Sequence, residues 1–119
     1  MRKIILSLTI FIVLNINADM TFFATKAKLW NISTDMEKFV YVAGLMDGAM
    51  LGGMKVQGIT ISTKLDTEQY VKAIDEFYKD YRNINIPVAF ILKVIAFELD
   101  GASDNTIKEI VLKLRNQNN

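Results

Sequence analysis

The sequence contains no cysteine and no histidine, and it has only one proline and one tryptophan in 119 residues. The absence of cysteine excludes disulfides, thiolate metal sites and a cysteine nucleophile. The absence of histidine excludes histidine-based triads, histidine general bases and most zinc sites. A chain of this length is expected to form one domain, and its stability must come from apolar packing or from a partner.

The N-terminus has the composition of a secretory signal. Arg2 and Lys3 are followed by an apolar run at residues 4–14 and by a short polar stretch that ends at Ala18. This order of charge, apolar run and small residue is typical of a cleaved signal peptide. The run is also shorter than the roughly 20 apolar residues of a membrane-spanning helix. The sequence therefore predicts a signal peptide at residues 1–18, a mature helical domain at residues 19–119, and a periplasmic or secreted location.

Two alternatives for this segment remain open. Cleavage after Ala24 would place the bulky Phe22 at the minus-three position, and an uncleaved run would remain as an N-terminal anchor. Cleavage after Ala18 predicts that the mature domain has no membrane attachment. Loss of Arg2 and Lys3 changes the formal net charge from +1 to −1, which provides no basic surface for nucleic acid.

The rest of the chain has the pattern of helices separated by short polar joints. Thr34 with Glu37 and Asp66 with Gln69 fit capping boxes, in which each side chain binds a free amide of the first turn. Helices are expected at residues 21–30 and 35–51, from 67 to about 81, from 87 to about 100, and from 104 onward, with an extended connector at residues 59–63. The predicted fold is therefore all-α, a compact bundle of four to five helices after the signal peptide.

The expected helix after Pro87 is apolar over most of its circumference, which is typical of a central, buried helix. Gly101 is expected to end this helix, and Ser103 is expected to cap the last one. The helix at residues 67–81 and the helix after Pro87 are expected to form an antiparallel pair. Charged residues of the former, including Asp75 and Lys79, are interpreted as a solvated face with ion pairs along the helix.

The expected helix at residues 35–51 begins an apolar stripe that recurs at three- and four-residue steps. The stripe comprises Met36, Phe39, Val40, Ala43, Met46, Met50 and Met54. Such a stripe normally packs into a core, where methionine fills irregular space. Its last three members also stand at successive four-residue steps, and thioethers are ligands for Cu(I), so a copper site is the alternative. We favour core packing, with no metal and no cofactor.

Asp47 lies at the edge of this stripe and is flanked by Gly44 and Gly48. We expect its carboxylate to be at least partly buried and bonded to Arg82 or to a tyrosine hydroxyl, because buried carboxylates are normally paired. The alternative is a buried carboxylate that acts as an acid or a base.

A candidate binding surface lies at the end of the helix at residues 67–81. Tyr78, Tyr81 and Arg82 are residue types that contribute strongly to protein interfaces. Gly52 and Gly53 are expected to adjoin them and to let a partner approach the backbone closely. The alternative is that the tyrosine rings pack inward and Arg82 bonds the carbonyls at the helix end.

Two stretches resemble a known family. Residues 39–48 contain Tyr41, Gly44 and Asp47-Gly48 in the pattern YxxGxxDG. The second stretch has a Thr-Glu-Gln start at residues 67–69, a helix, Pro87 and another helix. Together they resemble small exported helical proteins of the type VI secretion immunity (Rap/Tai-like) group. Members of that group bind and block a cell-wall amidase in the periplasm, and many carry a disulfide, whereas this chain has no cysteine.

The resemblance implies a binding protein whose partner is a cell-wall enzyme. We therefore predict a periplasmic, immunity-like protein that acts by steric occlusion of a protein partner and is not an enzyme. The first alternative is a structural or accessory envelope protein with no inhibitory role. The second is an enzyme that uses Asp47 or another carboxylate.

Overall fold

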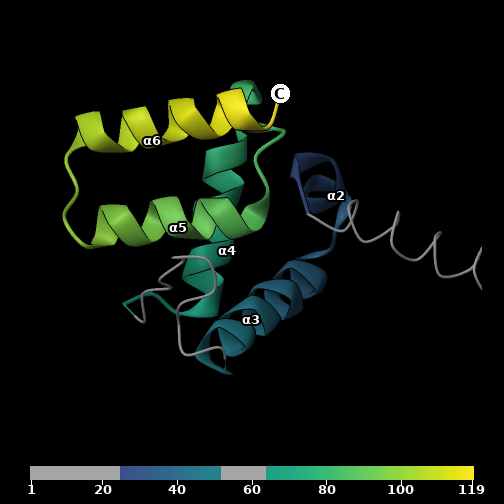
Figure 1. Cartoon of the computed structure of the whole chain (residues 1–119). Helices are drawn as coiled ribbons and strands as arrows, with labels where there is room; N and C mark the ends of the chain where they lie inside the picture. The colour runs from purple at the N-terminus through teal and green to yellow at the C-terminus, as the bar shows by residue number, and fades with distance from the viewer. Residues whose placement is uncertain (1–24, 52–63) are drawn as a thin grey trace, which may run out of the picture.

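A computed structural model describes residues 25–51 and 64–119 of the chain (Figure 1). Its helices within these ranges are α2 (Ala27–Ile32), α3 (Asp35–Leu51), α4 (Thr67–Tyr78), the short 3-10 helix η1 (Tyr81–Asn83), α5 (Val88–Leu99) and α6 (Asp104–Gln117). No strand occurs in the same ranges. The prediction of an all-α helical bundle is confirmed. The predicted signal peptide and the extended connector lie outside the described residues.

The helix starts follow the predicted caps. Thr34 and Glu37 form a reciprocal pair, in which the Thr34 N–H donates to Glu37 Oε2 at 2.7 Å and the Glu37 N–H donates to Thr34 Oγ1 at 3.2 Å. Asp66 and Gln69 form the same box before α4. Each box satisfies amides that have no partner within their own helix. This local chemistry explains why α3 and α4 begin where the sequence predicts.

The end of α4 differs from the prediction. The helix stops at Tyr78, whereas residues 67 to about 81 were expected to be helical. The Asp80 side chain accepts a hydrogen bond from the Arg82 N–H and starts η1, so the chain leaves the α-helical path. Short side chains that bond nearby backbone amides compete with helix continuation in this way.

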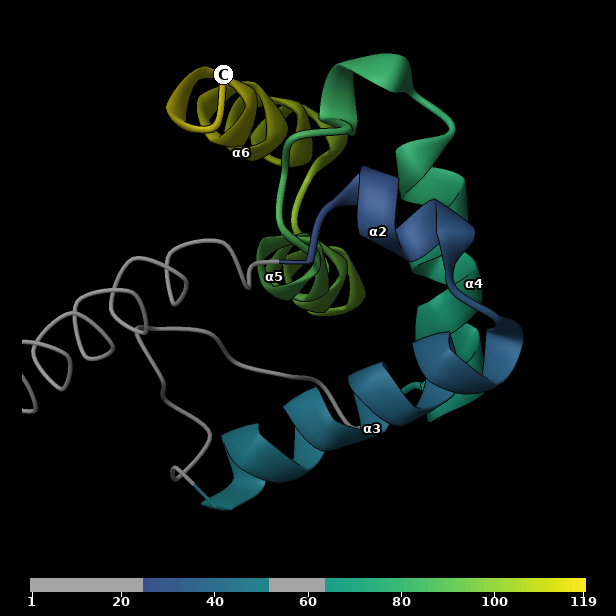
Figure 2. The ribbon, with the colours of Figure 1, turned by 90° about the vertical axis from the view of Figure 1, so that its right-hand side faces the viewer.

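Helix α5 lies at the centre of the bundle, as its all-round apolar surface predicts. Figure 2 shows it end-on, with α2, α3, α4 and α6 around it. Its buried residues are Val88, Ile91, Leu92, Val94, Ile95 and Ala96. Gly101 adopts a φ of 89° just after the helix, and Ser103 caps α6 by accepting the Thr106 N–H. Both predicted boundary residues are confirmed.

The antiparallel pair was assigned to the wrong helices. Helices α5 and α6 run antiparallel side by side, whereas α4 crosses α5 steeply (Figures 1 and 2). The Gly101 joint between α5 and α6 is short and favours a hairpin. The joint between α4 and α5 contains η1, which turns the chain before α5 begins.

Helix α2 begins at Ala27, later than the expected start at residue 21, and residues 21–24 lie outside the described ranges. The chain before it is tied to the joint between η1 and α5. The Ala27 N–H donates to the Ile84 carbonyl at 3.2 Å, and the Val88 N–H donates to the Thr25 carbonyl at 2.8 Å. Thr25 and Ala27 are buried. This pairing seats α2 against the centre of the bundle.

The apolar stripe predicted for the core is only partly buried in α3. Met36, Phe39 and Val40 were expected in the core, but they are 70%, 42% and 60% exposed. Met46, also a member of the predicted stripe, packs partly against the core as expected. Val42 and Ala49, which the stripe does not include, are buried, and Leu45 packs partly beside them. The helix is apolar on both sides, so periodicity alone does not select the inner one. Met54 and the side chain of Met50 lie outside the description.

Candidate functional site

A polar cluster of three side chains joins α2, α3 and α4. The Trp30 indole Nε1–H donates to Asp75 Oδ1 at 2.7 Å, and Lys38 Nζ donates to the same oxygen at 2.9 Å. Lys38 Nζ also lies 5.3 Å from the centroid of the Trp30 ring, within the range of a cation–π contact. These contacts attach one residue from each of α2 and α3 to a single carboxylate on α4.

This arrangement corrects the predicted solvated face of α4. Asp75 was expected to pair with Lys79 along the helix, but Lys79 pairs with Glu76. Asp75 is half-exposed, and its carboxylate faces Lys38 of α3. The Lys38 side chain is only 12% exposed. The pair is therefore a tertiary contact, which is less screened by solvent than an exposed pair along one helix.

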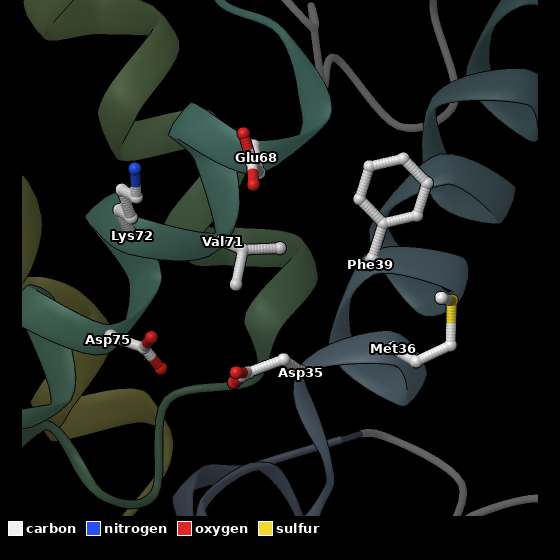
Figure 3. A pocket seen from close by; sticks show the side chains of 7 residues that line it. All are labelled: Asp35, Met36, Phe39, Glu68, Val71, Lys72 and Asp75. Carbon is white, nitrogen blue, oxygen red and sulfur yellow. The ribbon is translucent and has the colours of Figure 1, made fainter.

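A groove of about 420 Å³ lies between α3 and α4, directly beside this cluster (Figure 3). We call it the α3/α4 groove. In the close view, Val71 extends from α4 toward Phe39 on α3, so an apolar stretch crosses its middle. The remaining lining residues are Asp35, Met36, Glu68, Lys72 and Asp75. The groove thus combines apolar walls with a rim that carries three carboxylates and one ammonium group.

The apolar strip of α3, defined by Met36, Phe39 and Val40, is the second part of this site. These residues occupy one side of the helix at steps of three and four residues, and all three are exposed. Met36 and Phe39 also line the α3/α4 groove. Large apolar side chains gathered on one exposed helix face are typical of a binding surface.

The predicted surface at the end of α4 is divided by the structure. Tyr78 is buried, and its hydroxyl donates to the Ile86 carbonyl at 2.6 Å, so it is a core residue and not a docking residue. Burial raises the pKa of the Tyr78 phenol above its usual range. Tyr81 is 78% exposed, and Arg82 is also exposed. Gly52 and Gly53 lie outside the described residues.

Arg82 belongs to a second polar cluster that links η1 to α6. It donates to Asp80 through Nε at 2.9 Å and through a terminal nitrogen at 2.7 Å. Arg115 of α6 donates to Asp80 Oδ2 at 3.0 Å and to Asn83 Oδ1 at 2.8 Å. The hydrogen bonds from Arg82, together with the nearby Arg115 charge, hold the pKa of the Asp80 carboxyl well below its usual range.

The prediction for Asp47 is wrong. Its side chain is exposed, and it makes no hydrogen bond to Arg82 or to a tyrosine hydroxyl in the part of the chain that the structure describes. Asp47 follows Val40 by seven residues and therefore lies on the same outward side of α3. The carboxylate is solvated because the helix packs through Val42 and Ala49 on its other side.

Within residues 25–51 and 64–119, no group of three or more acidic residues is placed to hold a metal ion. None of the helices in those two ranges is long and apolar enough to cross a membrane. Comparison of the chain with family models, with curated proteins and with solved structures finds no match.

Proposed function

We propose that the chain is an exported, periplasmic protein that binds a protein partner, a cell-wall enzyme, and blocks it by steric occlusion. The observation that carries this proposal is the apolar strip of α3. Export is supported by the charge, apolar run and small residue of residues 1–18. The choice of partner rests on the resemblance to the type VI secretion immunity group.

The exposure of the strip has a physical cost that a partner would relieve. Full burial of a side chain of this size is worth about 1.5–3 kcal/mol. Met36 and Val40 retain more than half of their surface in contact with water, so most of that free energy is still available for binding. Methionine also adapts its shape to a partner, and aromatic residues such as Phe39 are common interface anchors.

The rim of the adjoining groove would then direct the partner. Asp35 and Glu68 contribute carboxylates from two different helices. Charged residues at the edge of an apolar interface mainly determine specificity and association rate. A stable complex needs a contact surface of roughly 800 Å² on each partner. Steric occlusion requires such a stable complex, because the active site must stay covered.

The test is capture from the envelope fraction of the native host with the full chain as bait. The paired variants are Met36→Ser/Val40→Ser on the strip and Leu112→Ser on α6. Leu112 is a matched control because it is equally apolar and 55% exposed, but lies outside the α3/α4 groove. We expect the wild type and Leu112→Ser to retain the same partner and the strip variant to lose it. Circular dichroism checks that all three proteins are folded.

The activity of the captured partner separates occlusion from the alternative. We expect a cell-wall enzyme whose activity falls in proportion to the amount of chain added. A partner that keeps its full activity when saturated would contradict occlusion and favour a structural or accessory envelope role. Retention of the same partner by the folded strip variant would contradict the proposed surface.

A further inference from the structure

A second groove lies between α5 and α6 and is separate from the site described above. Its volume is about 290 Å³, and we call it the α5/α6 groove. It is lined by Phe90, Lys93, Phe97, Ile110, Lys113, Leu114 and Gln117. Among the described residues, the lining therefore consists of apolar side chains, one amide and two ammonium groups, without a carboxylate.

Lys93 and Lys113 are the two charged side chains among the described residues that line this groove. Neither Lys93 nor Lys113 forms an ion pair within residues 25–51 and 64–119. Lys93 Nζ instead lies 5.9 Å from the centroid of the Phe97 ring, which holds one positive charge over the apolar lining. Lys113 places the second positive charge on the α6 side of the groove.

The apolar part of the groove is also incompletely covered. Phe97 is 38% exposed. Phe90, which lies two helical turns earlier on the same face of α5, is half-buried. Solvated lysines with their stems over apolar surface are common and need no ligand. Here, however, both ammonium groups line one concave, phenylalanine-containing groove, and this combination is complementary to an anionic and apolar occupant.

We propose that the α5/α6 groove binds an acidic amphipathic segment of a partner protein. An apolar side chain of that segment packs between Phe90 and Phe97, and carboxylates on either side of it meet Lys93 and Lys113. The concave shape favours an inserted peptide over a flat anionic membrane, because a side chain fills the groove and a planar surface bridges it. This inference does not rest on the function proposed for the α3/α4 groove.

The test uses the full chain and three capped, alanine-based helical peptides as probes. The first peptide has one leucine with a glutamate one helical turn before it and another one turn after it. The second replaces both glutamates with glutamine, and the third replaces the leucine with serine. Titration of fluorescently labelled peptide measures each affinity. We expect the first peptide to bind best and its affinity to fall with added salt, because the ion pairs are near the surface.

Matched variants locate the binding. We expect Lys93→Gln/Lys113→Gln to weaken binding of the glutamate peptide roughly tenfold, the combined effect of two partly exposed ion pairs. Phe97→Ala should weaken the two peptides that carry leucine and should have little effect on the serine peptide, which has no apolar side chain to pack against the ring. Lys108→Gln and Leu112→Ala should bind like the wild type, because both residues lie on α6 and neither lines this groove. Thermal unfolding checks that every variant is folded.

Several outcomes would overturn the proposal. The proposal is wrong if the wild-type protein does not bind the glutamate peptide at millimolar concentration. It is also wrong if the glutamine peptide binds as tightly as the glutamate peptide, or if the double lysine variant binds the glutamate peptide as tightly as the wild type does. Binding to phosphatidylglycerol vesicles tests whether the groove recognises an anionic membrane instead of a peptide. Binding to these vesicles that requires Lys93 and Lys113, without binding of the glutamate peptide, would assign the surface to a membrane instead.

Discussion

The indole Nε1–H of Trp30 donates a 2.7 Å hydrogen bond to Oδ1 of Asp75, the oxygen that also accepts Lys38 Nζ at 2.9 Å. Trp30 is only 1% exposed, so its donor has no ready access to water if the carboxylate is removed. Apolar contacts have little directional preference, whereas this bond fixes the rotation of α2 against α4. One carboxylate thus positions two helices.

Replacement of Asp75 tests this role. We expect Asp75→Ala to lower the free energy of unfolding by about 1–3 kcal/mol, because it leaves the buried Trp30 donor and the partly buried Lys38 ammonium group without their acceptor. Glu76→Ala is the control, since Glu76 pairs with Lys79 on the exposed surface and should change stability by about 0.5 kcal/mol or less. Urea unfolding followed by circular dichroism measures both. Equal effects of the two substitutions would show that the cluster has no special role.

Tyr78 and Tyr81 provide a direct comparison of a buried and an exposed hydroxyl. We expect Tyr78→Phe to cost about 1 kcal/mol, because the Ile86 carbonyl loses its 2.6 Å partner without access to water. Tyr81→Phe should be nearly neutral, because this side chain is 78% exposed. The same unfolding measurement compares them. A larger effect at Tyr81 would contradict the assignment of Tyr78 to the core.

Tyr78 also predicts a loss of stability at alkaline pH. Burial raises the pKa of its phenol in the folded state, whereas the unfolded chain loses this proton near pH 10. Folding therefore favours the protonated form, and the stability is present below about pH 10 and lost as the pH rises further. Wild-type stability should fall relative to Tyr78→Phe above that pH. A difference between the two proteins that stays constant would refute the linkage.

Asp80 predicts the opposite dependence in acid. The hydrogen bonds from Arg82 lower the pKa of the folded carboxyl, whereas an unfolded aspartate takes up a proton near pH 4. The stabilisation is therefore complete above about pH 4 and is lost as the pH falls below it. We expect the stability gap between wild type and Asp80→Asn to narrow in that range. Asparagine can still cap η1, so the substitution removes mainly the negative charge of Asp80. A difference in stability that does not change with pH would show that this charge is not responsible for it.

Gly101 and Gly44 should respond to alanine with opposite signs. Gly101 has a φ of 89°, and apart from Gly101 and its two chain neighbours no atom of the described residues lies within 4 Å of the position of an added Cβ. Gly101→Ala should therefore lose about 1–2 kcal/mol of stability through its backbone conformation alone. Gly44 lies inside α3 with similar free space, and Gly44→Ala should stabilise by about 0.5–1 kcal/mol. Thermal unfolding distinguishes the two, and losses at both positions would contradict this interpretation.

The parts of the fold that depend on neighbouring residues could be predicted from the sequence. Thr34 and Asp66 cap α3 and α4 by exchanging hydrogen bonds with the residue three positions later. Gly101 ends α5 because its own backbone adopts a positive φ. The central position of α5 follows from its composition, because a helix without a polar side must be covered. These signals lie within one helical turn or one helix and do not require knowledge of the tertiary structure.

The inner face of α3 and the α3/α4 groove could not be predicted in this way. Val40 and Val42 are equally suited to a core, and only the packing of α4 against one side of α3 selects Val42. The contact between Trp30 and Asp75 joins residues that are 45 positions apart. Trp30 and Lys38 are close in the sequence, but nothing in the sequence near them identifies Asp75 as the carboxylate that they share.

Export remains the most accessible prediction of the sequence. We expect N-terminal sequencing of the protein from the envelope fraction to begin at Asp19, because Ala18 is the small residue after the apolar run. Substitution of Arg2 and Lys3 by glutamate should reduce the exported fraction. A cytoplasmic protein that retains Met1 would contradict export.

The seating of Thr25 has a consequence for where processing can occur. Thr25 is 7% exposed, and its carbonyl accepts the Val88 N–H at the start of the central helix. If a peptidase cut the chain after Ala24, the nitrogen of the buried residue Thr25 would become a charged ammonium group, and burial of a charge costs free energy unless a partner compensates it. A cut after Ala18 keeps that nitrogen as a neutral amide and places the new charge six residues earlier. If the predicted signal peptide is removed, the burial of Thr25 therefore favours the cut after Ala18 over the cut after Ala24.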